Sequence, residues 1–535
     1  MITFDNVTFT YGAEREPVLS GADIAVPEGE LALLVGPTGC GKSTLLKCVN
    51  GLAPHFTGGT LRGRVTVAGL STADRPPRDL ADVVGYVPQD PQHGFVTDIV
   101  EDELAYTMES LAVPADVMRR RVEETLDLLG IADLRDRSLR TLSGGQRQRV
   151  AIGSVLTAHP KVLILDEPTS ALDPQAAEEV LATVQRLVHD LALTVLLSEH
   201  RLERVIQYAD RVLLIDERGR VADYADPSDA MAVSQLVPPV VDLGKWANWT
   251  PLPLSIRDAR RAAVRLRAEL PPPGFPVGGQ VGVVVADVSR ASRSWGSVQA
   301  LRSASLNVRA GDVVALMGRN GAGKSTLLAL LSGQDRPGGG TVRVSGRDPA
   351  DLRGRDLVST VGLVPQEPQD LLWAETVAAE CEGADRDAGA AAGTAWGLFT
   401  TLHPNTDPGT HPNDLSEGTR LALVLAIMLT GDPDLLLLDE PTRGLDYLAK
   451  RRLAALLRER AESGTAIVIA THDVELVADV CSRMVMLADG EVVLDTDARS
   501  GAASSPAFAP QVAKVLAPLP YLTVTEVKDA MAGRA

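Results

Sequence analysis

Two glycine-rich stretches of the chain have the residue types and the spacing that bind phosphate. They read GPTGCGKST from Gly36 and GRNGAGKST from Gly318. In the pattern G-x-x-x-x-G-K-[ST], the glycines let successive backbone N–H groups turn toward anionic oxygens, and the lysine reaches the terminal phosphates. An apolar run precedes each stretch and a run with helical character follows it, so a helix would present its positive end to the phosphates. The two matches predict two nucleotide sites.

All residues of these two loops are predicted to line a phosphate site, and the serines after the lysines are predicted to place hydroxyls on Mg²⁺. Cys40 lies inside the first loop near the positive end of a helix, a setting that activates a thiol. We expect alkylation of Cys40 to inhibit the first site, although a small filler at this position explains it equally well, since Ala322 stands there in the second loop. The loop residues are Gly36, Pro37, Thr38, Gly39, Cys40, Gly41, Lys42, Ser43 and Thr44, and Gly318, Arg319, Asn320, Gly321, Ala322, Gly323, Lys324, Ser325 and Thr326.

Two aspartate–glutamate pairs follow apolar runs at matching distances from the two lysines. Asp166 and Glu167 end the run VLILDE, and Asp439 and Glu440 end the run LLLLDE. An aspartate at the end of a buried strand can hold a metal ion through water, and the next carboxylate points the other way, where it can polarise an attacking water. A lone pair of this kind would be a solvated strand end, but its recurrence favours chemistry.

Histidines follow the next apolar run in each half, His200 after VLLSE and His472 after IVIAT. Their matched placement makes both of them candidates for the same two sites. No role is assigned to the histidines without a matched partner, which are His55, His93, His159, His189, His403 and His411.

The motifs recur in the same order in both halves, which indicates duplication of a whole domain. VGYVPQDPQ from Val84 matches VGLVPQEPQ from Val361, and LSGGQ from Leu142 matches LSEGT from Leu415. Apolar runs alternate with helical runs, which predicts an α/β fold with a parallel-sheet core and an inserted helical segment in each half. The expected segments are domain one at 1–236, its C-terminal appendage and the linker at 237–280, domain two at 281–500, and its appendage at 501–535.

The segment that joins the two halves contains SIRDARRAAVRLRAEL, which is predicted to form a helix capped by Ser255, followed by the breaker PPPGFP. In the helical segment of the second half, AAECEGADRDAGAAAGTAWGLFTTL is rich in alanine and glycine, so the sequence alone leaves its helices open.

With these motifs, the chain resembles the ABC ATPases over nearly all its length in two copies. The resemblance is carried by the two phosphate loops, Gln89 and Gln366, LSGGQ, the DEP strands, the SALD and RGLD loops, and the two histidines. It implies two P-loop NTPase domains, each with a parallel-sheet core, an antiparallel β subdomain, a helical subdomain and a C-terminal appendage. It also implies ATP hydrolysis with Mg²⁺ in a head-to-tail pair, in which each nucleotide meets one domain's phosphate loop and the other domain's signature loop.

The resemblance also assigns expected roles to individual residues. Tyr11 and Trp295 resemble the aromatic residue that stacks on adenine, with a buried strand residue as the alternative. The signature residues expected at the nucleotides are Ser143, Gly144, Gly145 and Gln146, with Ser416 and Gly418 in the second copy. The expected catalytic residues are Glu167, Glu440, His200, His472, Gln89 and Gln366, and the expected metal ligands are Ser43, Gln89, Asp166, Ser325, Gln366 and Asp439.

The second signature loop departs from the family pattern at two positions. Glu417 replaces a glycine and adds negative charge, and Thr419 shortens a glutamine. In a head-to-tail pair this loop would face the nucleotide held by Lys42. We therefore expect the site of Lys42 and Glu167 to hydrolyse ATP more slowly than the site of Lys324, which the intact LSGGQ loop would complete.

A finer resemblance is to the ATP-binding components of energy-coupling-factor importers, the cobalt and vitamin uptake group. It is carried by TDIVEDELAYTMESLAVP after the first glutamine loop, by LLSEHRLERVIQYADRVLLIDE, and by the PLP-containing tails. The resemblance implies a transmembrane coupling subunit, a substrate-binding membrane subunit, and a location at the cytoplasmic face of the cell membrane. Phe95 and Val96, with Leu372 and Trp373, are placed to meet the coupling subunit, and core packing is the alternative.

Whole-chain composition restricts the function classes. The 535 residues are 45% hydrophobic and 23% charged, which is typical of a globular protein with more than one domain. A formal net charge of −18 argues against binding nucleic acid through its phosphates. No apolar run approaches the roughly twenty residues of a membrane-spanning helix, and we expect no secretory signal. The four cysteines lack metal-binding spacing and fit a reducing cytosol.

Two other functions are compatible with a tandem of this kind. Sugar or peptide importers also use tandem ATPases, but those for sugars commonly lose the second lysine of the phosphate loops, whereas Lys324 is present here. Soluble ribosome-associated tandem proteins usually join their halves through a long charged helical arm, and the proline-rich linker fits that pattern poorly.

Overall fold

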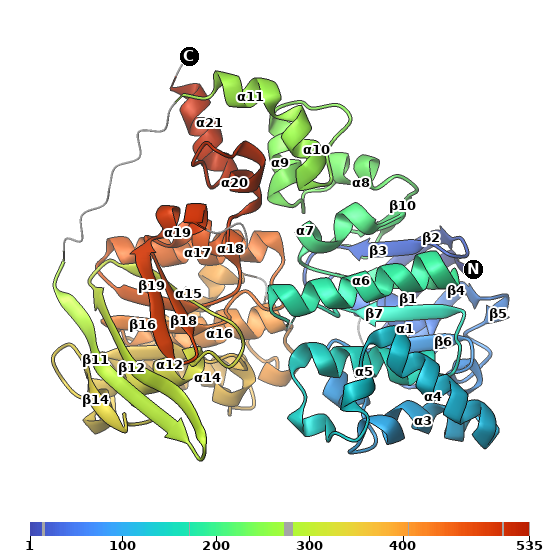
Figure 1. Cartoon of the computed structure of the whole chain (residues 1–535), viewed down its shortest axis with the longest axis horizontal. Coiled ribbons are helices and arrows are strands. Elements are labelled where there is room, and N and C mark those ends of the chain that lie inside the picture. The colour runs from blue at the N-terminus through green and yellow to red at the C-terminus, as the bar shows by residue number, and fades with distance from the viewer. Residues whose placement is uncertain (13–15, 171, 272–281, 405, 505–507, 534–535) are drawn as a thin grey trace. The chain divides into compact units, whose positions relative to one another are not determined.

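The computed structural model describes the chain except for residues 13–15, 171, 272–281, 405, 505–507 and 534–535. It divides into two compact units, Met1–Ser255 and Ile256–Ala535 (Figure 1). The division falls inside the segment 237–280, and most of the predicted breaker PPPGFP lies outside the described residues.

The first unit is built on a six-stranded sheet in which all neighbours are parallel except the edge pair β10–β9. Its central strands β3, β7 and β8 are buried at every position, as expected for apolar runs covered on both faces. The strand order is β10 (Val221–Tyr224), β9 (Arg211–Ile215), β3 (Leu31–Val35), β8 (Thr194–Ser198), β7 (Val162–Asp166), β6 (Val84–Val87).

The second unit repeats this sheet, again with a single antiparallel pair at the edge, between β18 and β19. The predicted parallel α/β core is therefore confirmed in both halves. The strand order is β15 (Val361–Val364), β16 (Leu435–Asp439), β17 (Ala466–Ala470), β13 (Val313–Met317), β18 (Arg483–Ala488), β19 (Glu491–Asp497).

Each unit also carries an antiparallel sheet, as the family resemblance implies. Apolar residues alternate along these strands and pack with those of the central sheet and of the helix after the phosphate loop, forming one core cluster between the two sheets of each unit. The first sheet has the order β2 (Leu19–Val26), β1 (Ile2–Thr10), β4 (Thr60–Val67), β5 (Leu70–Ser71), and the second has the order β12 (Val298–Arg309), β11 (Val284–Trp295), β14 (Gly339–Val344).

The inserted helical segments form three helices in each unit. The alanine- and glycine-rich segment of the second unit, which the sequence left open, is helical and packs around Phe399. The helices are α3 (Val100–Ser110), α4 (Ala115–Leu129) and α5 (Gly144–Leu156), and α14 (Val377–Ala388), α15 (Thr394–Leu402) and α16 (Glu417–Thr430).

The remaining helices of the two cores follow the phosphate loops or flank the sheets. They are α1 (Lys42–Val49), α2 (Leu52–His55), α6 (Pro174–Leu191) and α7 (Leu202–Val205), and α12 (Lys324–Leu331), α13 (Arg355–Val358), α17 (Tyr447–Glu462) and α18 (Val474–Val480). In the part of the chain that the structure describes, every helix is too short or too polar to span a bilayer.

The appendages are short helices. The single helix predicted after Ser255 is instead two, because the backbone at Ala263 leaves helical geometry. Within the second unit, Arg260 and Arg267 donate to the carbonyls of Lys514 and Val515, which packs this linker pair against α20. The appendage helices are α8 (Pro227–Val233), α9 (Pro239–Trp246), α10 (Ile256–Ala262), α11 (Val264–Glu269), α19 (Ala498–Ser504), α20 (Gln511–Leu516) and α21 (Val524–Ala532).

Candidate nucleotide sites

The first phosphate loop joins the end of β3 to the start of α1, as predicted. Gly41 has φ 102°, and a Cβ there would lie 2.8 Å from Val18 Cγ1, so the backbone turn requires glycine. Lys42 is buried, and its Nζ donates to the carbonyls of Gly36 at 3.0 Å and Pro37 at 2.9 Å. The ammonium group is therefore held over its own loop, where a phosphate would lie.

The second phosphate loop joins β13 to α12 in the same way. Lys324 Nζ donates to the carbonyls of Gly318 at 2.7 Å and Arg319 at 3.2 Å. It also lies 3.2 Å from His472 Nε2, which in turn lies 3.1 Å from Asn320 Oδ1. The predicted lysine and the predicted histidine of this site are therefore in direct contact.

Three of the predicted catalytic residues of the first domain meet beyond the end of β7. Glu167 Oε1 lies 2.8 Å from His200 Nε2, and Gln89 Nε2 donates to Glu167 Oε2 at 3.2 Å. Glu167 has φ 49°, a left-handed conformation that is strained for a non-glycine residue. This backbone turn separates the Glu167 carboxylate from that of Asp166, which accepts from the Ser198 hydroxyl at 2.7 Å.

The second domain repeats this arrangement with looser contacts. Glu440 has φ 50°, and its Oε1 lies 3.4 Å from His472 Nε2. Ser325 Oγ donates to Asp439 Oδ2 at 2.8 Å, so two of the three residues predicted to hold a metal ion in this domain lie side by side. Gln366 and Glu440 line the same pocket.

Both predicted metal-binding aspartates fit a cation. Burial raises the pKa of Asp166, although the Ser198 hydroxyl opposes this shift. Burial likewise raises the pKa of Asp439, opposed by the Ser325 hydroxyl and then by the charge of Lys324. A carboxylate whose charge is penalised by burial gains most from a divalent cation beside it.

Glu199 is a buried residue of the first site that sequence analysis missed. One of its oxygens accepts the backbone N–H of Thr169 at 2.9 Å, and the other accepts that of His200 at 3.1 Å. It therefore fixes the turn after Glu167 relative to the histidine. Burial raises the pKa of Glu199. The signal was the mismatch between SEH in the first copy and ATH in the second.

The two predicted adenine-stacking residues lie in different surroundings. Tyr11 packs edge-on against Phe9, and its hydroxyl lies 3.0 Å from Thr44 Oγ1 in the phosphate loop. Trp295 is 53% exposed, and the Arg293 guanidinium lies 4.6 Å from its ring centroid. The exposed ring of Trp295 suits stacking better than Tyr11 does, and both roles stay predictions.

Both signature loops place their serine at the N-cap of a helix. Gly144, Gly145 and Gln146 form the first turn of α5, and Gln146 closes a capping box with Ser143, each side chain accepting the other residue's backbone N–H. Ser143 is thereby held, exposed, at the N-terminal end of α5, with the two glycines in the first turn.

In the second loop, Ser416 Oγ accepts the backbone N–H of Thr419 at 3.2 Å and lies 2.8 Å from the Thr419 hydroxyl. Gly418 lies beside Glu417 in the first turn of α16. The serine therefore caps its helix in both loops, and the residue that it contacts is a glutamine in the first loop and a threonine in the second.

Glu417 lies in a pocket of the second domain together with Gln366 and Glu440. A Cβ on Gly444 would lie 2.0 Å from Glu417 Oε2, so the added side chain of Glu417 occupies space that only a glycine leaves open. The first copy has Gly144 in place of Glu417 and an alanine, Ala171, in place of Gly444. Ala171 lies outside the described residues.

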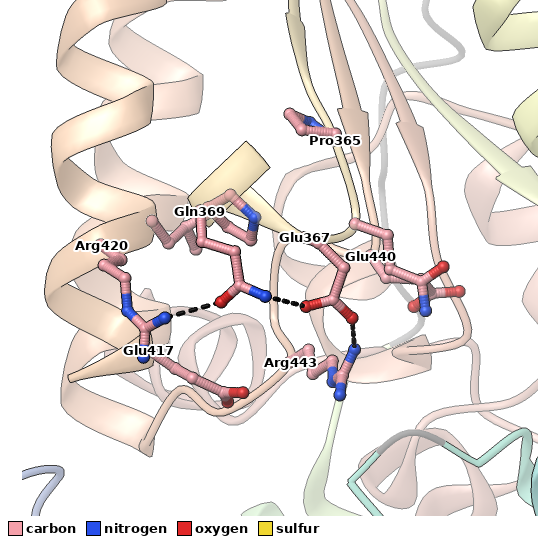
Figure 2. Close-up of a pocket in the computed structure, with 10 residues that line it drawn as sticks. Pro365, Glu367, Gln369, Glu417, Arg420, Glu440 and Arg443 are labelled. Carbon is pink, nitrogen blue, oxygen red and sulfur yellow. Dashed lines mark hydrogen bonds and ion pairs between the residues drawn. The ribbon is translucent and has the colours of Figure 1, made fainter. Parts of the chain in front are cut away.

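A row of hydrogen bonds crosses the same pocket (Figure 2). Arg420 donates to Gln369 Oε1 at 2.7 Å, Gln369 donates to Glu367 at 3.4 Å, and Glu367 forms an ion pair with Arg443. The row connects α16, the glutamine loop and the turn after Glu440. The sequence did not predict this row of hydrogen bonds. The one difference that pointed to it is the arginine of RGLD, where the first copy has the serine of SALD.

Comparison with known proteins agrees with this fold. Residues 19–170 and 301–443 each match the family described as ABC transporter. The chain therefore belongs to the ABC transporter family, and it is a tandem ABC ATPase that binds and hydrolyses ATP.

Individual relatives match nearly the whole length of the chain. A protein of Streptomyces avermitilis assigned as an ABC transporter ATP-binding protein is 59% identical over 99% of this chain and 100% of its own length. One of Methanosarcina mazei assigned in the same way is 32% identical over 92% of this chain and 88% of its own. The archaeal ribosome recycling factor aABCE1, solved with the stalk protein aP1, has a TM-score of 0.60 at 20% identity and covers 94% of this chain and 92% of that one. At that identity the likeness shows a shared fold.

Proposed function

We propose that this tandem ABC ATPase is the motor of an energy-coupling-factor importer. It works at the cytoplasmic face of the cell membrane and powers uptake of a vitamin or a metal ion through a transmembrane coupling subunit and a substrate-binding membrane subunit. The observation that supports this proposal is an exposed apolar side chain held beside each glutamine loop, on the segment that would meet a membrane partner.

Trp373 is 86% exposed and Val96 is 60% exposed, so neither is a core residue. In the second domain the Glu380 side chain accepts the backbone N–H groups of Trp373 and Ala374. In the first domain Glu103 accepts the N–H of Val96 at 3.0 Å in the same way. Each apolar side chain is therefore presented to solvent on a segment tied down by a glutamate, where the proposed membrane partner would contact it.

The proposed chemistry at each site is attack of water on the γ-phosphorus of ATP, with ADP as the leaving group. Lys42 and Lys324 hold the β- and γ-phosphates, and Glu167 and Glu440 polarise the water. Mg²⁺, when bound, neutralises charge on the phosphate oxygens. It would be held by Ser43, Gln89 and Asp166 in the first domain and by Ser325, Gln366 and Asp439 in the second.

At the first site, His200 and Gln89 each hold one oxygen of Glu167. This fixes the plane of the carboxylate toward the proposed water. At the second site, His472 contacts both Glu440, the proposed base, and the phosphate-loop lysine. Binding of a phosphate to Lys324 would therefore also affect the position of the His472 ring. In both sites the histidine acts through the glutamate and does not itself attack.

The membrane-partner proposal is tested with Trp373→Asp in the full chain. We expect the variant to lose co-purification with integral membrane proteins from native membranes and to lose the stimulation of its ATPase by them, while its ATPase alone stays unchanged. Val493→Asp is the matched control, because Val493 is also exposed in the second domain but lies on β19. Unchanged recovery of membrane proteins with Trp373→Asp, or co-sedimentation of the wild-type chain with ribosomes alone, would overturn the proposal.

A further inference from the structure

A chain of side-chain hydrogen bonds runs into the signature loop of the second domain and ends on its serine. Thr406 Oγ1 lies 3.2 Å from His403 Nδ1, and His403 Nε2 lies 3.2 Å from Thr419 Oγ1. Thr419 Oγ1 lies 2.8 Å from Ser416 Oγ. Thr419 is 5% exposed, so the imidazole is connected to the signature serine through one buried hydroxyl.

The first domain differs at both positions that build this chain. Counted back or forward from the signature serine, Gly130 stands where the second domain has His403, and Gln146 stands where it has Thr419. Gln146 instead caps the helix together with the backbone of its own serine. The two domains therefore differ at both positions, and the departure of LSEGT from LSGGQ is accompanied by a difference outside the loop.

The proton on His403 Nε2 decides which way the two hydroxyls point. An unprotonated Nε2 can only accept, so Thr419 donates to it, and Ser416 donates to Thr419. A protonated Nε2 donates to Thr419, whose own proton then goes to the Ser416 oxygen. That oxygen already accepts the Thr419 backbone N–H, so both lone pairs are used and the Ser416 O–H is directed out of the chain.

We propose that His403 is a positioning residue that turns the Ser416 hydroxyl into a donor for the γ-phosphate of ATP. The inference rests on the proposed role of Ser416 at a γ-phosphate. When an anionic oxygen accepts a hydrogen bond from Ser416 O–H, every link from Ser416 to His403 has a proton only if His403 Nε2 carries one. His403 Nδ1 then accepts from the Thr406 hydroxyl. The ring loses a proton at Nδ1 and gains one at Nε2 through water, so its charge does not change.

The groups around His403 favour the neutral ring that this exchange requires. Burial lowers the pKa of His403, the charge of Arg452 lowers it further, and Asp446 opposes them. Arg452 also donates to the Leu402 carbonyl at 3.4 Å, which keeps the cation near the ring. A neutral imidazole has one N–H, and its position is what ATP would select.

The test uses the full chain carrying Glu167→Gln and Glu440→Gln, so that bound ATP is not hydrolysed, and measures ATP and ADP binding by calorimetry. We expect Thr419→Val or His403→Leu to lower the affinity for ATP at one of the two sites about tenfold. A loss of this size is the effect of one hydrogen bond to a charged group. ADP binding should not change, because ADP has no γ-phosphate. Thr419→Ser, which keeps the hydroxyl, should restore ATP binding.

Two further measurements separate positioning from packing. The double variant of Thr419→Val and His403→Leu should bind ATP no more weakly than either single variant, since both cut the same chain. ¹⁵N spectra of the labelled histidines should show the His403 N–H on Nε2 with ATP bound, and that signal should be absent from the His403→Leu spectrum, which assigns it.

Three results would count against the inference. If Ser416→Ala weakens ATP binding while Thr419→Val and His403→Leu do not, the hydrogen bonds from His403 do not act on the serine. The inference is then wrong, although the role of the signature loop stands. If Ser416→Ala has no effect, the proposed role of the serine is itself wrong. Equal losses of ATP and ADP binding would show damage to the fold and would also overturn the inference.

Discussion

At the residue scale, the two proposed hydrolytic glutamates have the same backbone but different neighbours. Glu167 is held by His200 at 2.8 Å, whereas Glu440 lies 3.4 Å from its histidine. That histidine, His472, shares its Nε2 with Lys324 at 3.2 Å. The first glutamate is thus tightly positioned, and the second belongs to a network that includes the phosphate-binding lysine.

Cys40 is predicted to be the thiol through which alkylation inhibits ATP hydrolysis. Cys40 is itself buried, but it lies in the phosphate loop just before a helix, whereas burial raises the pKa of Cys48 and of Cys381 to about 12 and raises that of Cys481 as well. The other three cysteines should therefore react poorly. We expect a small alkylating reagent to lower the ATPase rate, and ATP to slow the loss because it covers the loop.

The control for Cys40 is Cys40→Ala, which copies the residue at the same position of the second loop, Ala322. This variant should keep its ATPase and resist the reagent. Mass spectrometry that finds Cys40 fully modified in a chain of undiminished activity would refute the prediction.

At the scale of elements, the sequence predicted those features that depend on the local pattern of residues. The buried strands, the phosphate loops and the helices after them follow from apolar runs and glycine spacing, and all are present. The break at Ala263 and the row from Arg420 to Arg443 could not be predicted, because they depend on side chains that meet only after the chain has folded. The same holds for His403, which the sequence left without a role.

The ion pair between Arg443 and Glu367 is predicted to hold the second glutamine loop against the turn after Glu440. Arg443→Ser, which copies Ser170 of the first domain, should lower the ATPase rate severalfold and change stability little, since a partly exposed ion pair contributes about 0–1 kcal/mol. Steady-state kinetics and thermal unfolding measure the two effects.

The matched test of this ion pair is a double-mutant cycle with Glu367→Gln. Loss of one shared contact predicts that the double variant is no slower than Arg443→Ser alone. Additive losses would mean that the two residues act separately.

At the scale of the whole molecule, duplication has produced two nucleotide sites that differ in their signature loops and in the residues behind them. The second copy has Glu417, Thr419 and His403 where the first copy has Gly144, Gln146 and Gly130. The resemblance to head-to-tail ABC pairs implies that this altered loop serves the nucleotide of the first phosphate loop. We therefore predict unequal turnover at the two sites.

Glu440→Gln should lower the steady-state ATPase rate of the full chain by more than roughly tenfold, since a general base contributes about 10²–10⁴ to a rate. Glu167→Gln should lower it less than about twofold, because the first site would already be the slower one. Equal losses in the two variants would contradict the asymmetry, and phosphate release under saturating ATP measures both.

The backbone at Glu167 and Glu440 is left-handed. At these two positions stability favours glycine, whereas the proposed hydrolysis requires a carboxylate. A non-glycine residue in this conformation costs on the order of 1 kcal/mol, which glycine would relieve. Glycine at either position would thus raise stability and remove the carboxylate, and both copies have glutamate there. Each domain therefore has a less stable backbone at this position than glycine would give, and the strained turn places a carboxylate beyond the end of its sheet strand.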